Sequence, residues 1–161
     1  MDHSVAHLNI MNDKRGSAVL LLGTLFIFSF FILSMFVMDY MVLKAQMQKS
    51  QDAVTAACLA ASGQINQEAL SYNVIEIDSA AAEATFLTYL DDNLQVTGAM
   101  VEEFVVYNQS DLPAVCSSGN TLTKPSVHVI VPITLARPAL RGLLGATYNF
   151  TIHIDCNNTL E

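Results

Sequence analysis

The residues of this sequence that could do chemistry gather in its C-terminal third. His128 and His153 lie in two stretches of alternating apolar and polar residues, and Asp155 follows closely. We expect both histidines on the more polar face of a sheet, with Asp155 on the other face. A zinc site needs about three or four Cys, His or carboxylate ligands, and no third ligand can be named beside the two histidines. The sequence therefore predicts no metal site there.

Other reactive residue types also lack a supporting pattern. Ser117 and Ser118 have no G-x-S-x-G context and no assigned base, so nucleophilic catalysis is not predicted. Asp91 and Asp92 are adjacent acids, but calcium requires more oxygen ligands at defined spacing. No glycine-rich phosphate-binding pattern occurs. We expect a protein that is not an enzyme, with no catalytic residues and no cofactor.

The chain has three cysteines, Cys58, Cys116 and Cys156, an odd number. We expect a disulfide between Cys116 and Cys156, which would tie the Pro- and Ser-rich loop 109–125 to the end of the last strand. In the chain-entropy model such a closure contributes roughly 4 kcal/mol. Cys58 lies in an Ala-rich stretch and is expected to be a small buried side chain. The cysteines have no C-x-x-C spacing, so they do not predict a metal site.

Composition narrows the class of protein. Seven Lys or Arg stand against 15 Asp or Glu, for a net charge of −8. An acidic protein surface repels the phosphate backbone of nucleic acids, so we expect no nucleic-acid partner. A chain of 161 residues leaves room for one small domain beyond a membrane span.

Residues 17–38 form an uncharged apolar run of 22 residues. As a helix it would be roughly 33 Å long, close to the ~30 Å hydrocarbon core of a bilayer. Lys14 and Arg15 precede it, which favours a cytoplasmic N-terminus and a C-terminal domain outside, in the periplasm or at the cell surface. A cleaved signal peptide fits poorly, because its apolar core is usually about 7–15 residues long. The sequence therefore predicts a leader at 1–16 and a retained single-pass span at 17–38.

The helix is expected to continue through 39–63 as an amphipathic helix, with Gly63 as its C-cap. No proline interrupts this segment, and its residues are good helix formers. Its apolar members recur at helical spacing. They are Tyr40, Leu43, Met47, Val54, Cys58, Ala61 and Ile65. One helix from 17 to 62 would be on the order of 70 Å long.

We expect the remaining residues, 64–161, to fold into a small α+β domain outside the membrane, which we call the head. Asp78 or Ser79 is expected to cap a second helix that ends near Asn93. Its inward residues are expected to be Phe86, Leu87 and Leu90. Residues 64–77 have a mixed pattern, and the short run 72–77 could be a strand or a loop.

In the last part of the head, the sequence predicts three antiparallel strands, at 100–107, 127–135 and 148–154. Pro132 cannot donate a hydrogen bond, so we expect it at a sheet edge or a bulge. The predicted fold class is therefore α+β: a long N-terminal helix, transmembrane and then amphipathic, packed on a small antiparallel sheet.

Residues 15–62 also carry a family pattern. Arg15-Gly16-Ser17 is followed by an apolar span that ends at Asp39, and then by MQKSQDAVTAACLAASG. This arrangement resembles the N-terminal region of the TadE/TadG-like proteins of tight-adherence (Flp) pilus systems, in which a basic leader ending in Gly precedes a span, an acidic residue and a helix of the type LQNAADAAALAA. Residues 127–133 and 138–145 are similar more weakly.

The resemblance implies a type IV pilin-like fold and a minor pilin, or pseudopilin. Its partners would be the lipid bilayer, other pilin-like subunits, the pilus assembly platform and a prepilin peptidase that cleaves between Gly16 and Ser17. Family members of the pilin type carry Glu at the fifth position after that bond, where this chain has Leu21. Whether the leader is cleaved therefore stays open. The resemblance implies that one helix face takes part in assembly: Asp39, Tyr40, Leu43, Met47, Val54, Cys58 and Ala61.

The function expected from these features is that of a non-enzymatic subunit of a Tad/Flp type IV pilus or a related secretion system, involved in pilus biogenesis and adhesion. A membrane-anchored binding or sensor domain is the alternative, and a polar pocket in the head would favour it. A secreted enzyme released by signal peptidase is a third, and it requires a mature N-terminus beyond residue 38.

Overall fold

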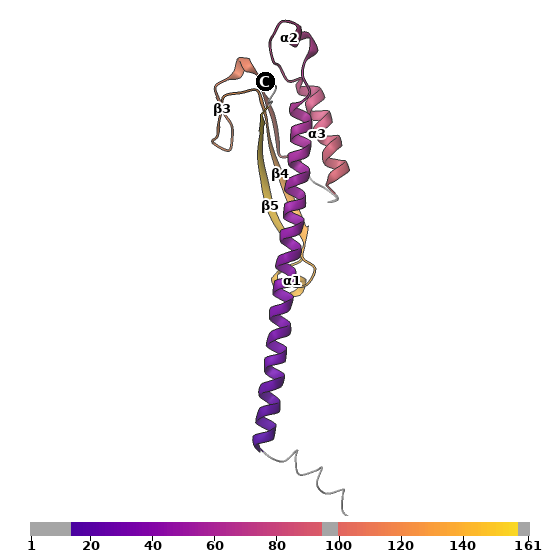
Figure 1. The fold of residues 1–161 in the computed structure, drawn as a ribbon, viewed down its shortest axis with the longest axis vertical. Coiled ribbons are helices and arrows are strands. Elements are labelled where there is room, and N and C mark those ends of the chain that lie inside the picture. Colours follow the sequence, from indigo (N-terminus) through magenta and orange to yellow (C-terminus); the bar gives the residue numbers. More distant parts are fainter. Residues whose placement is uncertain (1–13, 95–99, 158–161) are drawn as a thin grey trace, which may run out of the picture.

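The computed structural model describes residues 14–94 and 100–157, and its α+β fold is built along one long helix (Figure 1). This helix, α1 (Lys14–Ser62), has 49 residues, and its N-terminal half extends away from every other element of the described chain. Its C-terminal half packs into the head. The predicted continuous helix and its end at Ser62 are confirmed. Of the leader predicted at 1–16, residues 1–13 lie outside the described part, and the last three form the first turn of α1.

The free half of α1 is apolar and satisfies its own polar groups. The hydroxyl of Thr24 donates to the carbonyl of Leu20 at 2.8 Å, and that of Ser34 donates to the carbonyl of Phe30 at 2.9 Å. Such bonds satisfy the donors of these two hydroxyls without water. Among the described residues, one helix is apolar and long enough to cross a membrane, and none of its most apolar window is buried. A helix from the core of a soluble protein would be mostly buried instead.

The segment that the sequence left open holds α2 (Gln67–Ser71) and a bridge between Ile65 and Ile77. Asn66 caps α2 with its side chain. The Asn108 side chain accepts from the Ile77 N–H at 2.7 Å and donates to the Ile77 carbonyl at 3.3 Å. It thereby ties this segment to the loop after the first strand.

The second long helix is α3 (Ser79–Asn93), and Asp78 caps it by accepting from two backbone N–H groups, as predicted. Phe86 and Leu90 are buried, but Leu87 is 47 % exposed, so its inward placement was wrong. The buried positions Ala82, Phe86 and Leu90 recur every four residues. That spacing makes one narrow stripe, and a residue one step further along turns away from it.

Three antiparallel strands form the main sheet, as predicted: β1 (Glu103–Tyr107), β4 (Ser126–Ala136) and β5 (Thr147–Asn157), in the order β1-β4-β5. The N–H of Glu102 donates to the carbonyl of Ile130 on β4. The backbone N–H and carbonyl groups of every second residue of β4, counted from Ile130, therefore point toward β1. Pro132 is the next such residue, and it lies beyond the end of β1. Pro132 lies in the central strand and pairs with Thr151 of β5, and its missing N–H faces the side on which no strand of the described residues pairs with it.

The core lies between one face of this sheet and the two long helices. α1 packs on β4 and β5, while α3 packs beside α1 and reaches β1. The rings of Phe86 and Phe104 meet there, with their centroids 5.3 Å apart. The largest buried members of the core are Phe86, Ile77, Ile133, Val54, Val127, Val129, Val131 and Cys58.

The other face of the sheet is covered at one end by the chain between β1 and β4. This segment holds the short 3-10 helix η2 (Gln109–Asp111) and a small hairpin of β2 (Ala114–Val115) and β3 (Thr121–Leu122). Beneath it the first residues of β4 are buried on both faces. The predicted surface loop 109–125 therefore closes onto the sheet.

Candidate functional site

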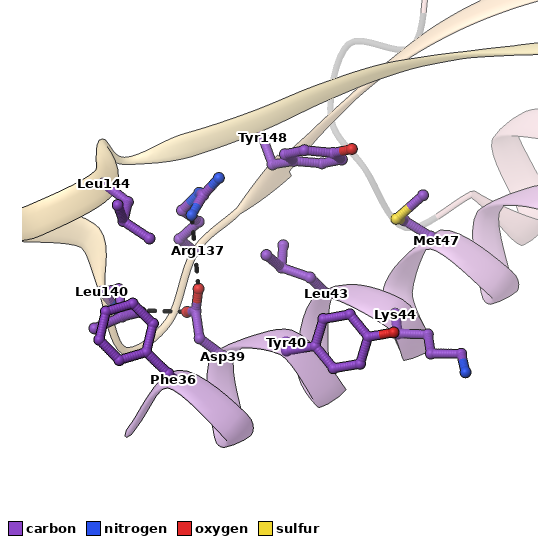
Figure 2. Close-up of a pocket in the computed structure, with 10 residues that line it drawn as sticks. All are labelled: Phe36, Asp39, Tyr40, Leu43, Lys44, Met47, Arg137, Leu140, Leu144 and Tyr148. Carbon is purple, nitrogen blue, oxygen red and sulfur yellow. Dashed lines mark hydrogen bonds and ion pairs between the residues drawn. The ribbon is translucent and has the colours of Figure 1, made fainter. Parts of the chain in front are cut away.

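A carboxylate marks the place where α1 meets the head. Asp39 is the first buried residue after the exposed half of the helix and is only 2 % exposed. Its Oδ1 accepts from the N–H of Ala139 at 3.1 Å. Figure 2 shows its other two partners: Oδ1 also accepts from the N–H of Leu140 at 3.4 Å, and Oδ2 lies 3.9 Å from Nη1 of Arg137. This single side chain fixes the β4–β5 connection, including α4 (Arg141–Leu144), to α1.

A cavity of about 500 Å³ opens beside this contact, between α1 and the end of the β4–β5 hairpin. The guanidinium of Arg137 lies 5.7 Å from the centre of the Tyr148 ring, and its buried Nε has no hydrogen-bond partner. The lining is mainly apolar, with Asp39, Lys44 and Arg137 as its charged members. The rest of it is formed by Phe36, Tyr40, Leu43, Met47, Leu140, Leu144 and Tyr148.

The structure places most of the predicted assembly face inside the molecule itself. Val54, Cys58 and Ala61 are wholly buried in the core, and Leu43 and Met47 pack against its edge. Tyr40 is different, because 64 % of its surface is exposed. In this fold the small residues of α1 let α3 and the sheet approach closely, and Tyr40 is the member of the face that another subunit could reach.

The residues around the expected cleavage point lie in the first turns of α1. Gly16 and Ser17 are helical, and Leu21 is 67 % exposed. An apolar side chain therefore projects from the helix where pilins of the family type carry a carboxylate.

A second group of polar residues lies under the loop at the other end of β4. The hydroxyl of Ser117 lies 2.8 Å from Nε2 of His128, and Nδ1 of His128 lies 2.5 Å from Oδ1 of Asp155. Asn120 donates from Nδ2 to Oδ2 of Asp155 at 2.7 Å, and Sγ of Cys116 lies 3.9 Å from the same oxygen. We call these five residues the loop cluster.

The register of β4 and β5 puts His128 and His153 on one face of the sheet, as expected. Their surroundings differ, because His128 is wholly buried whereas His153 is exposed. His128 pairs directly with Asp155 across β4 and β5, so both side chains lie on one face of the sheet. The expected placement of Asp155 on the opposite face was wrong. Residues 153 and 155 are two apart on one strand and therefore share a face, a signal that the sequence already contained.

Electrostatics keep the Asp155 carboxyl ionised. Burial raises its pKa, but hydrogen bonds from His128, Asn120 and Cys116, with electrostatic attraction to His128, together outweigh burial, and the pKa of Asp155 lies below its ordinary value. Glu103 adds a second acid near the ring, with Oε1 4.0 Å from Nε2 of His128. A buried imidazole thus lies between two carboxylates.

The side chains of Ser117, His128 and Asp155 contact one another in the same succession as the serine, histidine and aspartate of a hydrolytic triad. Nucleophilic catalysis further requires oxyanion donors and a cavity for the substrate. The cavity beside Arg137 cannot serve these residues, because it lies at the opposite end of β4 from His128. What the loop cluster visibly does is hold the loop to β4 and β5.

The predicted disulfide is wrong. Cys116 and Cys156 are both free thiols, as is Cys58. Cys156 directly follows Asp155 on β5 and so points to the opposite face, into the core, whereas Cys116 lies beside Asp155. Hydrogen bonds from the loop cluster take the place of the expected covalent tie.

Cys58 is the small buried side chain that the sequence predicted. It is wholly buried, and its Sγ lies 3.6 Å from the carbonyl of Val127. Its neighbour in the core is Cys156, and the interaction of the two thiols, together with burial, strongly raises the pKa of Cys58. Such a thiol is inert as a nucleophile.

Comparison of the chain with protein-family models, with curated proteins and with solved structures finds no match in any of the three.

Proposed function

We propose that this chain is a membrane-anchored, non-enzymatic assembly subunit of the TadE/TadG-like, minor-pilin type. The observation that carries the proposal is the division of α1 into two halves. Residues 17–38 expose an uncharged, largely apolar surface, and burial begins at Asp39. A fully exposed helix of about 33 Å is costly in water and matches the bilayer core.

The proposed arrangement places the exposed half of α1 in the membrane and the head outside it. Asp39 and its partners Ala139, Leu140 and Arg137 would then lie at the membrane surface, where they hold the head at a fixed position on the helix. A head fixed to one end of a long apolar helix has the shape of a type IV-like pilin. Subunits could associate through the exposed helix, including Phe28 and Tyr40, while the Ala-rich face stays inside each head.

The alternative function, an anchored sensor, would be favoured by a polar pocket in the head. The cavity at the junction has a mainly apolar lining and contacts the helix beside its exposed half. It suits a role in fixing the helix better than one in recognising a polar ligand.

Anchoring is tested by adding charge to the exposed half of α1. Leu25→Asp combined with Phe28→Asp places two carboxylates at positions that are 62 % and 67 % exposed. Each should cost about 2.5–3.5 kcal/mol in the bilayer centre. We expect the chain to leave carbonate-washed membranes. The matched control, Leu59→Asp with Val115→Asp, adds the same charge at head positions 55 % and 67 % exposed and should stay membrane-bound. Retention of the first variant would contradict anchoring.

The pilus role is tested in the host. A strain lacking the chain should assemble no surface pili, and the wild-type chain should restore them while the Leu25→Asp, Phe28→Asp variant should not. Normal pili in the deletion strain would refute the role. The mature N-terminus identifies the processing route: Ser17 supports the pilin-like route, Met1 or Met11 an uncleaved anchor, and a start beyond residue 38 a secreted product.

A further inference from the structure

The loop cluster has the donor set of a transition-metal site. Cys116, His128 and Asp155 each offer one ligand atom, and the three atoms lie within 4.8 Å of one another. Thiolate, imidazole and carboxylate are the ligands that zinc uses in proteins. Cys116 and His128 are buried, and the Asp155 side chain is 19 % exposed.

Two distances, one to each carboxylate oxygen of Asp155, lie on either side of the spacing that a bound ion requires. Tetrahedral zinc with bonds of about 2.0–2.3 Å places neighbouring ligand atoms roughly 3.3–3.6 Å apart. Sγ of Cys116 and Oδ2 of Asp155 are 3.9 Å apart, slightly wider than that. The His128–Asp155 contact at 2.5 Å is shorter, and a small rotation of the carboxylate would open it.

The three ligands come from three separate segments of the head. Cys116 follows β2 in the loop, His128 lies on β4 and Asp155 on β5. The regular strand structure within the loop is a hairpin whose two strands have two residues each. Such a short hairpin contributes few hydrogen bonds to hold the loop in place. An ion bound to all three ligands would join the loop to both long strands.

We propose that Cys116, His128 and Asp155 bind a zinc-class divalent cation that fastens the loop 109–125 to the sheet. On binding, the Cys116 thiol releases its proton to solvent and the sulfur becomes a thiolate ligand. A water molecule fills the fourth position from the side of Ser117 and Ser118, which are both exposed. This site does not depend on the pilus function or on membrane insertion.

Cobalt(II) is the probe, because a Co²⁺–thiolate bond gives a near-ultraviolet charge-transfer band. Full-length, reduced protein in detergent should bind one Co²⁺ with this band, and Zn²⁺ should remove it. Cys116→Ser should abolish the band, and Asp155→Asn should weaken Co²⁺ binding at least tenfold. Cys156→Ala is the matched control: it removes a thiol from the other face of the sheet and should leave the band intact.

A second measurement needs no variant. Zn²⁺ should slow alkylation of Cys116 in the wild-type protein at least tenfold, without slowing that of Cys58 or Cys156, as followed by peptide mass spectrometry. The proposal is overturned if folded wild-type protein shows no thiolate band, if Cys116→Ser keeps it, or if Zn²⁺ leaves the alkylation of Cys116 unchanged.

Discussion

Removal of the Phe86 side chain tests how the head is held together. Phe86 is wholly buried and is the largest fully buried side chain among the described residues. It connects α3 to α1 and to β1, where its ring meets Phe104 at 5.3 Å. Phe86→Ala should destabilise the head by about 3–5 kcal/mol, because the transfer free energy of the ring is lost and a cavity remains. A small domain has only about 5–15 kcal/mol of stability in total.

The matched control is the next residue. Leu87 has a similar apolar character and lies on the same helix, but it is 47 % exposed. Leu87→Ala should therefore change the free energy of unfolding by no more than about 0.5–1 kcal/mol. The pair separates burial from helix propensity, because both substitutions introduce Ala into α3.

Urea unfolding of the detergent-solubilised chain measures both variants. The protein has five Tyr and no Trp, so tyrosine fluorescence reports on the folded state. The midpoint should fall strongly for Phe86→Ala at an unchanged m-value, and little for Leu87→Ala. Equal losses for the two variants, or a loss below about 1 kcal/mol for Phe86→Ala, would refute this account of the core. A double-mutant cycle with Phe104→Ala should give a coupling of about 0.5–1.5 kcal/mol.

Two further predictions concern the carboxylates. Asp39→Ala leaves the N–H groups of Ala139 and Leu140 without their acceptor. The free energy of unfolding should fall by about 2–4 kcal/mol, and hydrogen exchange of these two amides should accelerate. Lys44→Ala, at an exposed cavity position, is the control and should leave both quantities unchanged. Because the pKa of Asp155 in the folded state lies below its ordinary value of 3.8, its stabilisation is present above that pH and is lost as the pH falls through the folded value. Asp155→Asn should therefore lower the urea midpoint more at about pH 6 than at about pH 2; an equal effect at both would contradict the linkage.

Sequence patterns predicted the elements of this fold well because those elements depend on local interactions. An unbroken run of helix formers predicts α1 through to Ser62, and the Asp78 cap predicts the start of α3. Alternation predicts β4 and β5, and a β-rich composition predicts β1. The misplaced Leu87 shows the limit: a helix propensity does not say which stripe of a helix faces its neighbours.

The candidate sites required the tertiary structure. Arg137 and the N–H groups of Ala139 and Leu140 follow Asp39 by about a hundred residues, and nothing local to Asp39 indicates that they are its partners. The disulfide prediction failed for a related reason: the spacing of Cys116 and Cys156 could not show that the loop lies on the face away from Cys156.

The sequence by itself determined that one long helix carries an uncharged apolar half, because length, composition and periodicity are properties of contiguous residues. Only the tertiary structure decided that the Ala-rich half of that helix is buried within its own head, and that Cys116, His128 and Asp155 meet. The physical reason is the same in both cases. Burial and the meeting of distant side chains depend on strand register and on which sheet face a loop covers, and these follow from packing of the whole chain.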